Sequence, residues 1–148
     1  MNIGLTAHNS KKTLLESFCI AYKGIFKKHT LIATNATANH IAKATGMKVT
    51  SLLPGQMGGS KQMQNMIANN DIDLVIFFHS ADLEQDAESM NLAEISRLCD
   101  MYNIPLATNI ATAESLVLCL DRGYGVERLQ IVRSYAQNAA LKAAFICF

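Results

Sequence analysis

The segment that most constrains the fold is residues 72–78, with the sequence Ile-Asp-Leu-Val-Ile-Phe-Phe. All of these residues except Asp73 are apolar, so the segment lacks the strict alternation of a strand with one exposed face. A short, almost uniformly apolar segment is typical of a strand that is covered on both faces. We therefore expect a parallel sheet with helices packed on each side of it.

Short apolar segments alternate with segments of helical period along the whole chain. Ser10 is the expected N-cap of the first helix, and Gly46 is expected to end the second. This alternation predicts a three-layer α/β/α, doubly wound fold with a five-stranded parallel sheet of flavodoxin- or Rossmann-like topology. The expected strands are residues 2–7, 30–33, 48–53, 72–78 and 106–108, and the expected helices are residues 11–28, 35–45, 61–70, 91–101 and 112–120.

Length and composition predict one domain with an ordinary apolar core. A chain of 148 residues fits a single domain, 1–148, and half of the residues are hydrophobic, which is enough for a core without disulfides or metals. The net charge of +1 provides no field for nucleic acid or for a membrane surface, so neither partner is expected. Residues 126–148 are expected to form a helical tail of the same domain.

The four cysteines lie in apolar segments and form no Cys-x-x-Cys pair. Buried free thiols are therefore expected, which is typical of a protein of the reducing cytoplasm. No signal peptide is visible, and the longest apolar segments fall far short of the ~20 residues of a membrane-spanning helix. No zinc-site spacing of His, Cys and Asp is present, so no metal is expected.

A glycine-rich turn, residues 54–60, lies between an expected strand and an expected helix. Such a turn presents backbone N–H groups at a helix N-terminus, where unpaired donors and the helix dipole favour an anion. Ligands of parallel α/β sheets bind at the carboxyl ends of the strands, which is where this turn is expected. Gly55, Gly58 and Gly59 are its candidate phosphate-binding residues, and Ser60 stands where a catalytic base could act on the ligand.

The loops after the first two strands add a cation and two hydroxyls. Lys12 lies in the first turn of a helix, against the dipole, so it either binds an anion there or belongs to a solvated basic face. Thr34 and Thr37 flank the start of the next helix and can be caps, phosphate donors, or both. Together with the glycine-rich turn they make a coherent site for a small phosphorylated compound. The Gly-x-Gly-x-x-Gly and Walker patterns of nucleotide sites are absent.

The loops after the fourth and fifth strands are less informative. His79 follows the fourth strand, and the acidic run that comes next is expected to be a solvated surface. In the last loop, Thr112 is expected to cap the helix and Asn109 to face the site. The carboxylates of the acidic run are Asp82, Glu84, Asp86 and Glu88.

In several of these segments the chain resembles the methylglyoxal synthase family. The resemblance is carried by the His-Asn-Ser-Lys-Lys loop, the Pro-Gly-Gln-Met-Gly-Gly turn and the Ile-Asp-Leu-Val-Ile-Phe-Phe strand, and it runs in register over residues 2–122. No resemblance covers the residues after Gly125. The matching segments are residues 3–12, 33–34, 44–46, 54–59, 72–78 and 104–113.

The resemblance implies a methylglyoxal synthase-like fold and the chemistry of that family. Its members remove a C3 proton from dihydroxyacetone phosphate to give an enediolate, and then eliminate inorganic phosphate to leave methylglyoxal. They use no metal or organic cofactor and are typically homohexamers, so a homo-oligomer without a cofactor is expected. Lys12, Thr34, Thr37 and Gly55 match phosphate-binding residues of the family, and His8 is retained as a candidate for binding and catalysis.

The acidic machinery of the family is not matched. Ser60 stands where the family has its Asp base, Asn9 where an Asp follows the first-loop His, and Ser80 where an Asp follows Phe-Phe. The family's Pro-His-x-Pro-Asp segment, which supplies the general acid, is absent. A replacement base would have to be His8, His79 or one of the carboxylates after residue 81.

The sequence thus predicts a protein that binds a small phosphorylated ligand, such as dihydroxyacetone phosphate or inorganic phosphate, with impaired catalysis. The reason is that a serine hydroxyl is not a base at neutral pH without an activator. One alternative is an active methylglyoxal synthase with a relocated base. Another is a non-catalytic oligomer subunit or regulatory domain, so whether the chain is an enzyme stays open at this point.

Overall fold

The computed structural model describes residues 1–81 and 91–123, which form a five-stranded, all-parallel sheet between two layers of helices. The strand order is β3-β2-β1-β4-β5, so the chain builds outward from β1 and then crosses to its other side. The predicted α/β fold with a five-stranded parallel sheet is confirmed. The strands are β1 (Asn2–Ala7), β2 (Thr30–Ala33), β3 (Val49–Ser51), β4 (Leu74–Phe78) and β5 (Leu106–Ala107).

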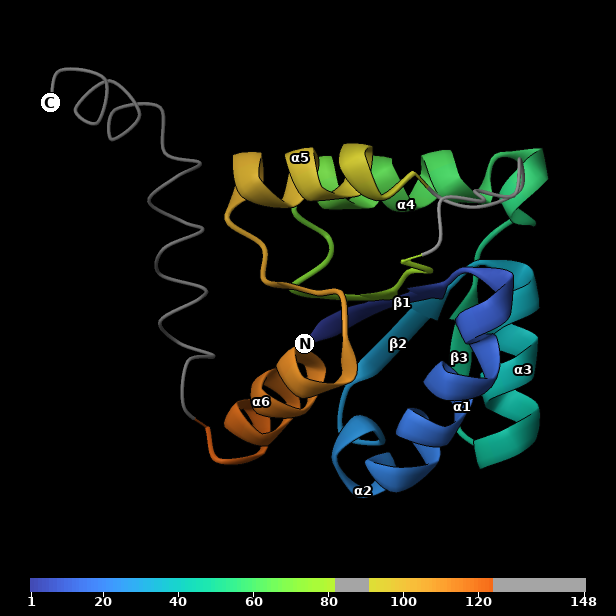
Figure 1. Cartoon of the computed structure of the whole chain (residues 1–148), viewed down its shortest axis with the longest axis vertical. Coiled ribbons are helices and arrows are strands. Elements are labelled where there is room, and N and C mark those ends of the chain that lie inside the picture. Colours follow the sequence, from blue (N-terminus) through green and yellow to red (C-terminus); the bar gives the residue numbers. More distant parts are fainter. Residues whose placement is uncertain (82–90, 124–148) are drawn as a thin grey trace, which may run out of the picture.

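The helices cover both faces of the sheet. Figure 1 shows α4 and α5 on one face, and α1, α2, α3 and α6 on the other. The expected helical tail and the acidic run after residue 81 lie outside the described residues. The helices are α1 (Lys12–Ala21), α2 (Lys23–Phe26), α3 (Asn35–Thr45), α4 (Gly59–Ala68), α5 (Leu92–Tyr102) and α6 (Ile110–Asp121), with the 3-10 turns η1 (Asn9–Lys11) and η2 (Gly55–Met57).

The position of strand β4 between two cores explains why its sequence is apolar at successive positions. Leu74, Ile76 and Phe78 point into the core shared with α1, α3 and α6. Val75 and Phe77 point into the second core, under α4 and α5. Because successive side chains of a strand alternate between its faces, a strand between two cores needs an apolar residue at every position.

The first helix differs from the sequence prediction at its start and in its middle. Ser10 is not its N-cap, because it lies inside η1; α1 begins at Lys12 after Lys11, which makes no side-chain cap. The expected helix over residues 11–28 is interrupted at Tyr22, whose φ of −107° and ψ of 20° leave the helical region. The hydroxyl of Tyr22 donates a hydrogen bond to Glu114 of α6, which holds this break against the neighbouring helix.

Helix ends were predicted with mixed success. Gly46 ends α3 with a φ of +71°, as expected for a glycine in the left-handed region. The prediction that Thr112 caps the last helix is wrong, because the Asn109 side chain accepts a hydrogen bond from the Thr112 N–H at 3.0 Å and α6 already begins at Ile110. Strand β4 begins at Leu74, two residues later than expected.

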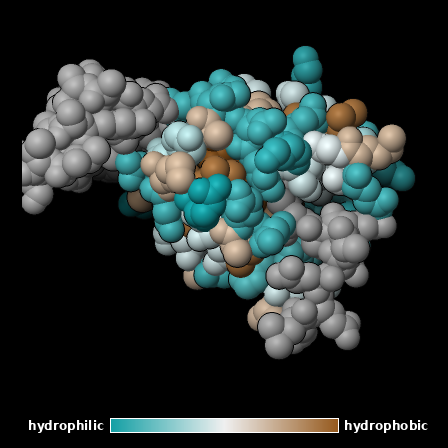
Figure 2. Space-filling model, turned by 90° about the horizontal axis from the view of Figure 1, so that it is seen from above, coloured by the Kyte–Doolittle hydropathy of each residue, from teal (hydrophilic) through white to brown (hydrophobic). Residues whose placement is uncertain are grey.

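The outer face of the α4–α5 layer is mostly hydrophilic where Figure 2 shows described residues, and its apolar residues are scattered. Among residues 1–81 and 91–123, no helix is long and apolar enough to cross a membrane.

Candidate functional site

The loops at the carboxyl ends of β1, β2 and β3 enclose a pocket of about 140 Å³. It is smaller than the roughly 300–1,000 Å³ of cavities that hold drug-sized ligands. Three helices, α1, α3 and α4, begin at these loops. The described residues that line the pocket are Thr6, Ala7, Asn9, Lys12, Thr34, Asn35, Ala36, Thr37, Pro54, Gly55, Gln56 and Ser60.

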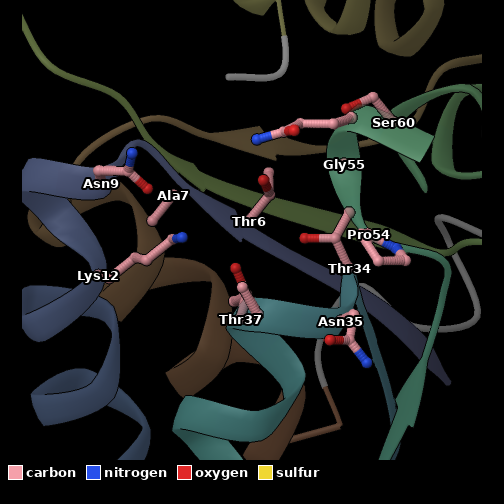
Figure 3. Close-up of a pocket in the computed structure, with 12 residues that line it drawn as sticks. Thr6, Ala7, Asn9, Lys12, Thr34, Asn35, Thr37, Pro54, Gly55 and Ser60 are labelled. Atoms are coloured by element: carbon pink, nitrogen blue, oxygen red, sulfur yellow. The ribbon is translucent and has the colours of Figure 1, made fainter. Parts of the chain in front are cut away.

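Lys12 supplies the positive charge of the pocket from the first residue of α1. In Figure 3 its amine points toward the space that the Thr34 and Thr37 hydroxyls also face. The ion pairs among residues 1–81 and 91–123 do not include Lys12. An ammonium group without a carboxylate partner, beside hydroxyls, is suited to an anionic ligand.

The hydroxyls of Thr34 and Thr37 lie at the start of α3. Thr34 occupies the N-cap position with extended backbone, but its side chain makes no cap hydrogen bond. Its hydroxyl therefore remains available to a ligand, and its role as a phosphate donor stays a prediction. Thr37 is buried, in the first turn of the helix. The first N–H groups of α3 add donors and positive potential at the same place.

The glycine-rich turn, residues 54–60, is a compact backbone loop, which we call the hook. The N–H groups of Met57 and Gly59 both donate to the Pro54 carbonyl, at 2.9 and 3.0 Å. Gly58 has a φ of +103°, which favours glycine. A Cβ on Gly59 would lie 1.9 Å from the carbonyl oxygen of Leu53, so only glycine fits there. Gly58 and Gly59 thus shape the hook that brings Gly55 into the pocket, and do not line it themselves.

The side chain of Gln62 fastens this hook to helix α4. Its Oε1 accepts a hydrogen bond from the Leu53 N–H at 2.7 Å. On the other side, the Asn35 N–H donates to the Leu53 carbonyl at 3.5 Å. The loops after β2 and β3 are therefore held together at Leu53.

Ser60 lines the pocket from the first turn of α4, on the side opposite Lys12 (Figure 3). No Asp, Glu or His occurs among the described residues that line the pocket. The described lining therefore offers no carboxylate or imidazole as a base toward the Ser60 hydroxyl.

The two candidate histidines lie together beyond the pocket. His8 is buried, and its Nδ1 accepts a hydrogen bond from the Ser80 N–H at 2.9 Å. The neutral ring therefore carries its proton on Nε2. The rings of His8 and His79 lie edge to face, 6.3 Å apart, and neither residue lines the pocket. Their catalytic roles, and the binding role of His8, stay predictions.

The buried cysteines do not contribute reactive groups. Burial raises the pKa of Cys19 and of Cys99 to about 12, and a nearby carboxylate adds to each shift. Both therefore remain thiols at neutral pH, and neither lines the pocket. Within residues 1–81 and 91–123, no three His, Cys, Asp or Glu side chains gather closely enough to hold a metal ion.

Sequence reasoning missed several residues of the pocket. Thr6 is a buried residue of β1 with a hydroxyl group. Its position next to the carboxyl end of that strand could have indicated that it lies at the site. Gln56 was contained in the glycine-rich turn but was not singled out. Asn109 was expected to face the site, but it caps α6 and is not among the lining residues.

Comparisons with known proteins agree with this geometry. The family model described as MGS-like domain matches residues 16–108. The methylglyoxal synthase of Caldicellulosiruptor saccharolyticus is 52% identical over 123 residues, which are 83% of this chain and 86% of that protein. That of Thermoanaerobacter sp. (strain X514) is 50% identical over 123 residues, which are 83% of this chain and 92% of that protein.

A solved structure extends the agreement to three dimensions. The crystal structure of methylglyoxal synthase from Elizabethkingia anophelis NUHP1 has a TM-score of 0.74 and 35% sequence identity, covering 78% of this chain and 76% of that chain. The match covers most of both chains. The chain therefore belongs to the methylglyoxal synthase family.

Proposed function

We propose that this protein binds a small phosphate ester of the dihydroxyacetone phosphate class, or inorganic phosphate, and that its proton-transfer chemistry is impaired. The composition of the pocket carries the proposal. One ammonium group, several hydroxyls and the start of α3 line it, whereas its described lining contains no carboxylate and no imidazole. Such a pocket attracts a phosphate group, but its described lining supplies no carboxylate or imidazole base for the rest of the molecule.

The binding half of the proposal follows from charge and donors. Lys12 provides the charge, and a hydrogen bond to a charged group contributes about 1.5–3 kcal/mol. Thr34 and Thr37 provide hydroxyl donors, and the N-terminus of α3 adds backbone N–H groups. The absence of a carboxylate from the described lining also removes repulsion toward a dianion.

The catalytic half rests on the missing base. Removal of a proton next to a carbonyl needs a positioned base, which contributes roughly 10²–10⁴-fold to the rate. Ser60 is the described residue at the position that the family resemblance assigns to the base, and its hydroxyl has no activator in the described lining. We therefore expect little or no turnover of a bound triose phosphate.

The second candidate function is the methylglyoxal synthase reaction itself. The observation in its favour is the 50–52% identity to proteins named methylglyoxal synthase, and those names favour this candidate over the impaired one. It requires a base from His8, His79 or the acidic residues after residue 81. A non-catalytic oligomer subunit is the third candidate, and it predicts no ligand effect at all.

One set of measurements separates these candidates. Purified protein is incubated with dihydroxyacetone phosphate, and methylglyoxal is measured against a heat-inactivated control. Formation above that control refutes the impaired reading and supports the synthase. With no formation, a melting temperature raised by inorganic phosphate or dihydroxyacetone phosphate supports the binder. If neither ligand changes the melting temperature, the non-catalytic subunit role is the remaining candidate. Size-exclusion chromatography with light scattering then measures whether the protein forms a defined oligomer.

Two substitutions locate the binding and the defect. Lys12→Met should weaken phosphate binding by about tenfold or more, because it removes the charged donor. Lys11→Met is the matched control, since Lys11 is the preceding residue and does not line the pocket. Ser60→Asp should create methylglyoxal formation if the remainder of the site is competent. Equal phosphate affinities of the two lysine variants would place the ligand elsewhere.

A further inference from the structure

A second cavity, of about 300 Å³, lies at the amino ends of the strands, whereas the phosphate pocket lies at their carboxyl ends. Its lining residues lie at the end of α2 and around the amino ends of β2 and β3. It is roomier than the phosphate pocket, and the proposed function makes no use of it.

The described residues that line this cavity carry positive charge. Lys27 and Lys48 both line it, and both are exposed. Among residues 1–81 and 91–123 neither enters an ion pair, whereas the adjacent Lys28 pairs with Asp121 at 3.3 Å. The described lining contains no Asp or Glu. Two ammonium groups thus border one hollow, and the nearby carboxylate of Asp121 is paired with Lys28.

Neutral polar groups and an apolar base complete the lining. Thr30 and Thr50 contribute exposed hydroxyls, and His29 contributes a half-buried imidazole. Beneath them, Leu31 and Met47 are buried and close the bottom of the cavity. The carbon stems of the lysines can pack against the body of a ligand while their ammonium groups hold its charges.

We propose that this cavity is a second ligand site, which takes a small organic anion carrying carboxylate or phosphate groups. Two of the strands connect it to the phosphate pocket. Strand β2 begins at Thr30 in the second cavity and ends immediately before Thr34 in the first. Strand β3 lies between Lys48 and Pro54 in the same way.

The test uses the full chain with the first site disabled. In Lys12→Met protein, succinate and inorganic phosphate are titrated separately, and binding is followed by calorimetry and by backbone amide NMR shifts. Both anions carry the required charge, so the two titrations also decide between a carboxylate and a phosphate ligand. The comparison is the double variant Lys27→Met/Lys48→Met, with Lys28→Met as the matched control.

At least one anion should bind, with amide shifts at residues 27–31 and 47–50. The double variant should raise its dissociation constant about tenfold, since an exposed charge contact contributes up to about fivefold. Lys28→Met should change it less than twofold. Absence of binding by both anions, or an equal loss in Lys28→Met, overturns the proposal. Because Lys12 is already replaced, failure of the phosphate pocket would leave this result unaffected.

Discussion

Replacement of Gly59 by alanine tests whether the glycine-rich hook shapes the phosphate pocket. The added Cβ would lie 1.9 Å from the Leu53 carbonyl oxygen, whereas ordinary contacts begin at 3.4 Å, so the two groups must separate by about 1.5 Å. The next atoms, the carbonyl carbons of Leu53 and Pro54, lie at 2.9 and 3.0 Å and are also backbone. No side-chain rotation can relieve the contact, so the hook has to open.

The expected cost follows from that displacement. Overpacking costs about 1–3 kcal/mol, and about 3 °C of melting temperature is lost per kcal/mol in a chain of this length, so we expect a decrease of roughly 3–10 °C. Opening the hook also moves Gly55 and Gln56, which line the pocket. A misplacement of about 1 Å disturbs a bound ligand strongly, so phosphate affinity should fall at least about tenfold.

Differential scanning fluorimetry with and without inorganic phosphate measures both effects. Gly24→Ala is the matched control, because a Cβ there meets nothing within 4 Å and Gly24 is not among the positive-φ residues. That variant should be unchanged, or stabilised by about 0.4–1 kcal/mol. A Gly59→Ala protein with the wild-type melting temperature and the wild-type phosphate shift would refute the reasoning.

Two further predictions concern titratable groups outside the pocket. Because burial raises the pKa of Cys19 and Cys99 to about 12, iodoacetamide at pH 7.5 should leave both unmodified in the native protein while it labels the exposed Cys119. Peptide mass spectrometry identifies the labelled cysteines. Labelling of Cys19 or Cys99 without denaturant would contradict this prediction. Burial, together with the charges of the N-terminal ammonium and Lys28, lowers the pKa of His29. The unfolded chain therefore binds this proton more readily, so the His29 contribution to stability is complete above pH ~6.5 and declines as the pH falls from there toward the lowered folded pKa. Urea unfolding of His29→Gln at pH 7 and pH 5 should show a smaller acid-side loss than the wild type, and an equal loss would argue against it.

The fold was predictable because its strongest signal is local. Residues 74–78 are apolar on both faces of one strand, and only a sheet covered on both sides satisfies them. The break at Tyr22 was not predictable, because apolar residues continue at helical spacing on both sides of it. The break coincides with a tertiary contact, since the Tyr22 hydroxyl donates to Glu114, 92 positions away in the sequence.

The candidate site was predictable to the extent that it depends on loops after strands. Lys12, Thr34 and Gly55 follow directly from the rule that ligands bind at the carboxyl ends of strands. His8 also directly follows β1, but the rule does not predict that it lies outside the pocket lining. Its ring is oriented by the Ser80 N–H, which lies in the loop after β4, and β4 is a neighbour of β1 only because the chain crosses β1 after β3.

The described lining of the phosphate pocket comes entirely from residues 6–60, so β4, β5 and the helices after them contribute none of it. A bound anion would therefore tie together only one half of the sheet, β1 to β3. Native-state hydrogen exchange should reflect this asymmetry, since a ligand suppresses the local openings that break its own site. Amide protection should increase at the starts of α1, α3 and α4 and stay unchanged in α6.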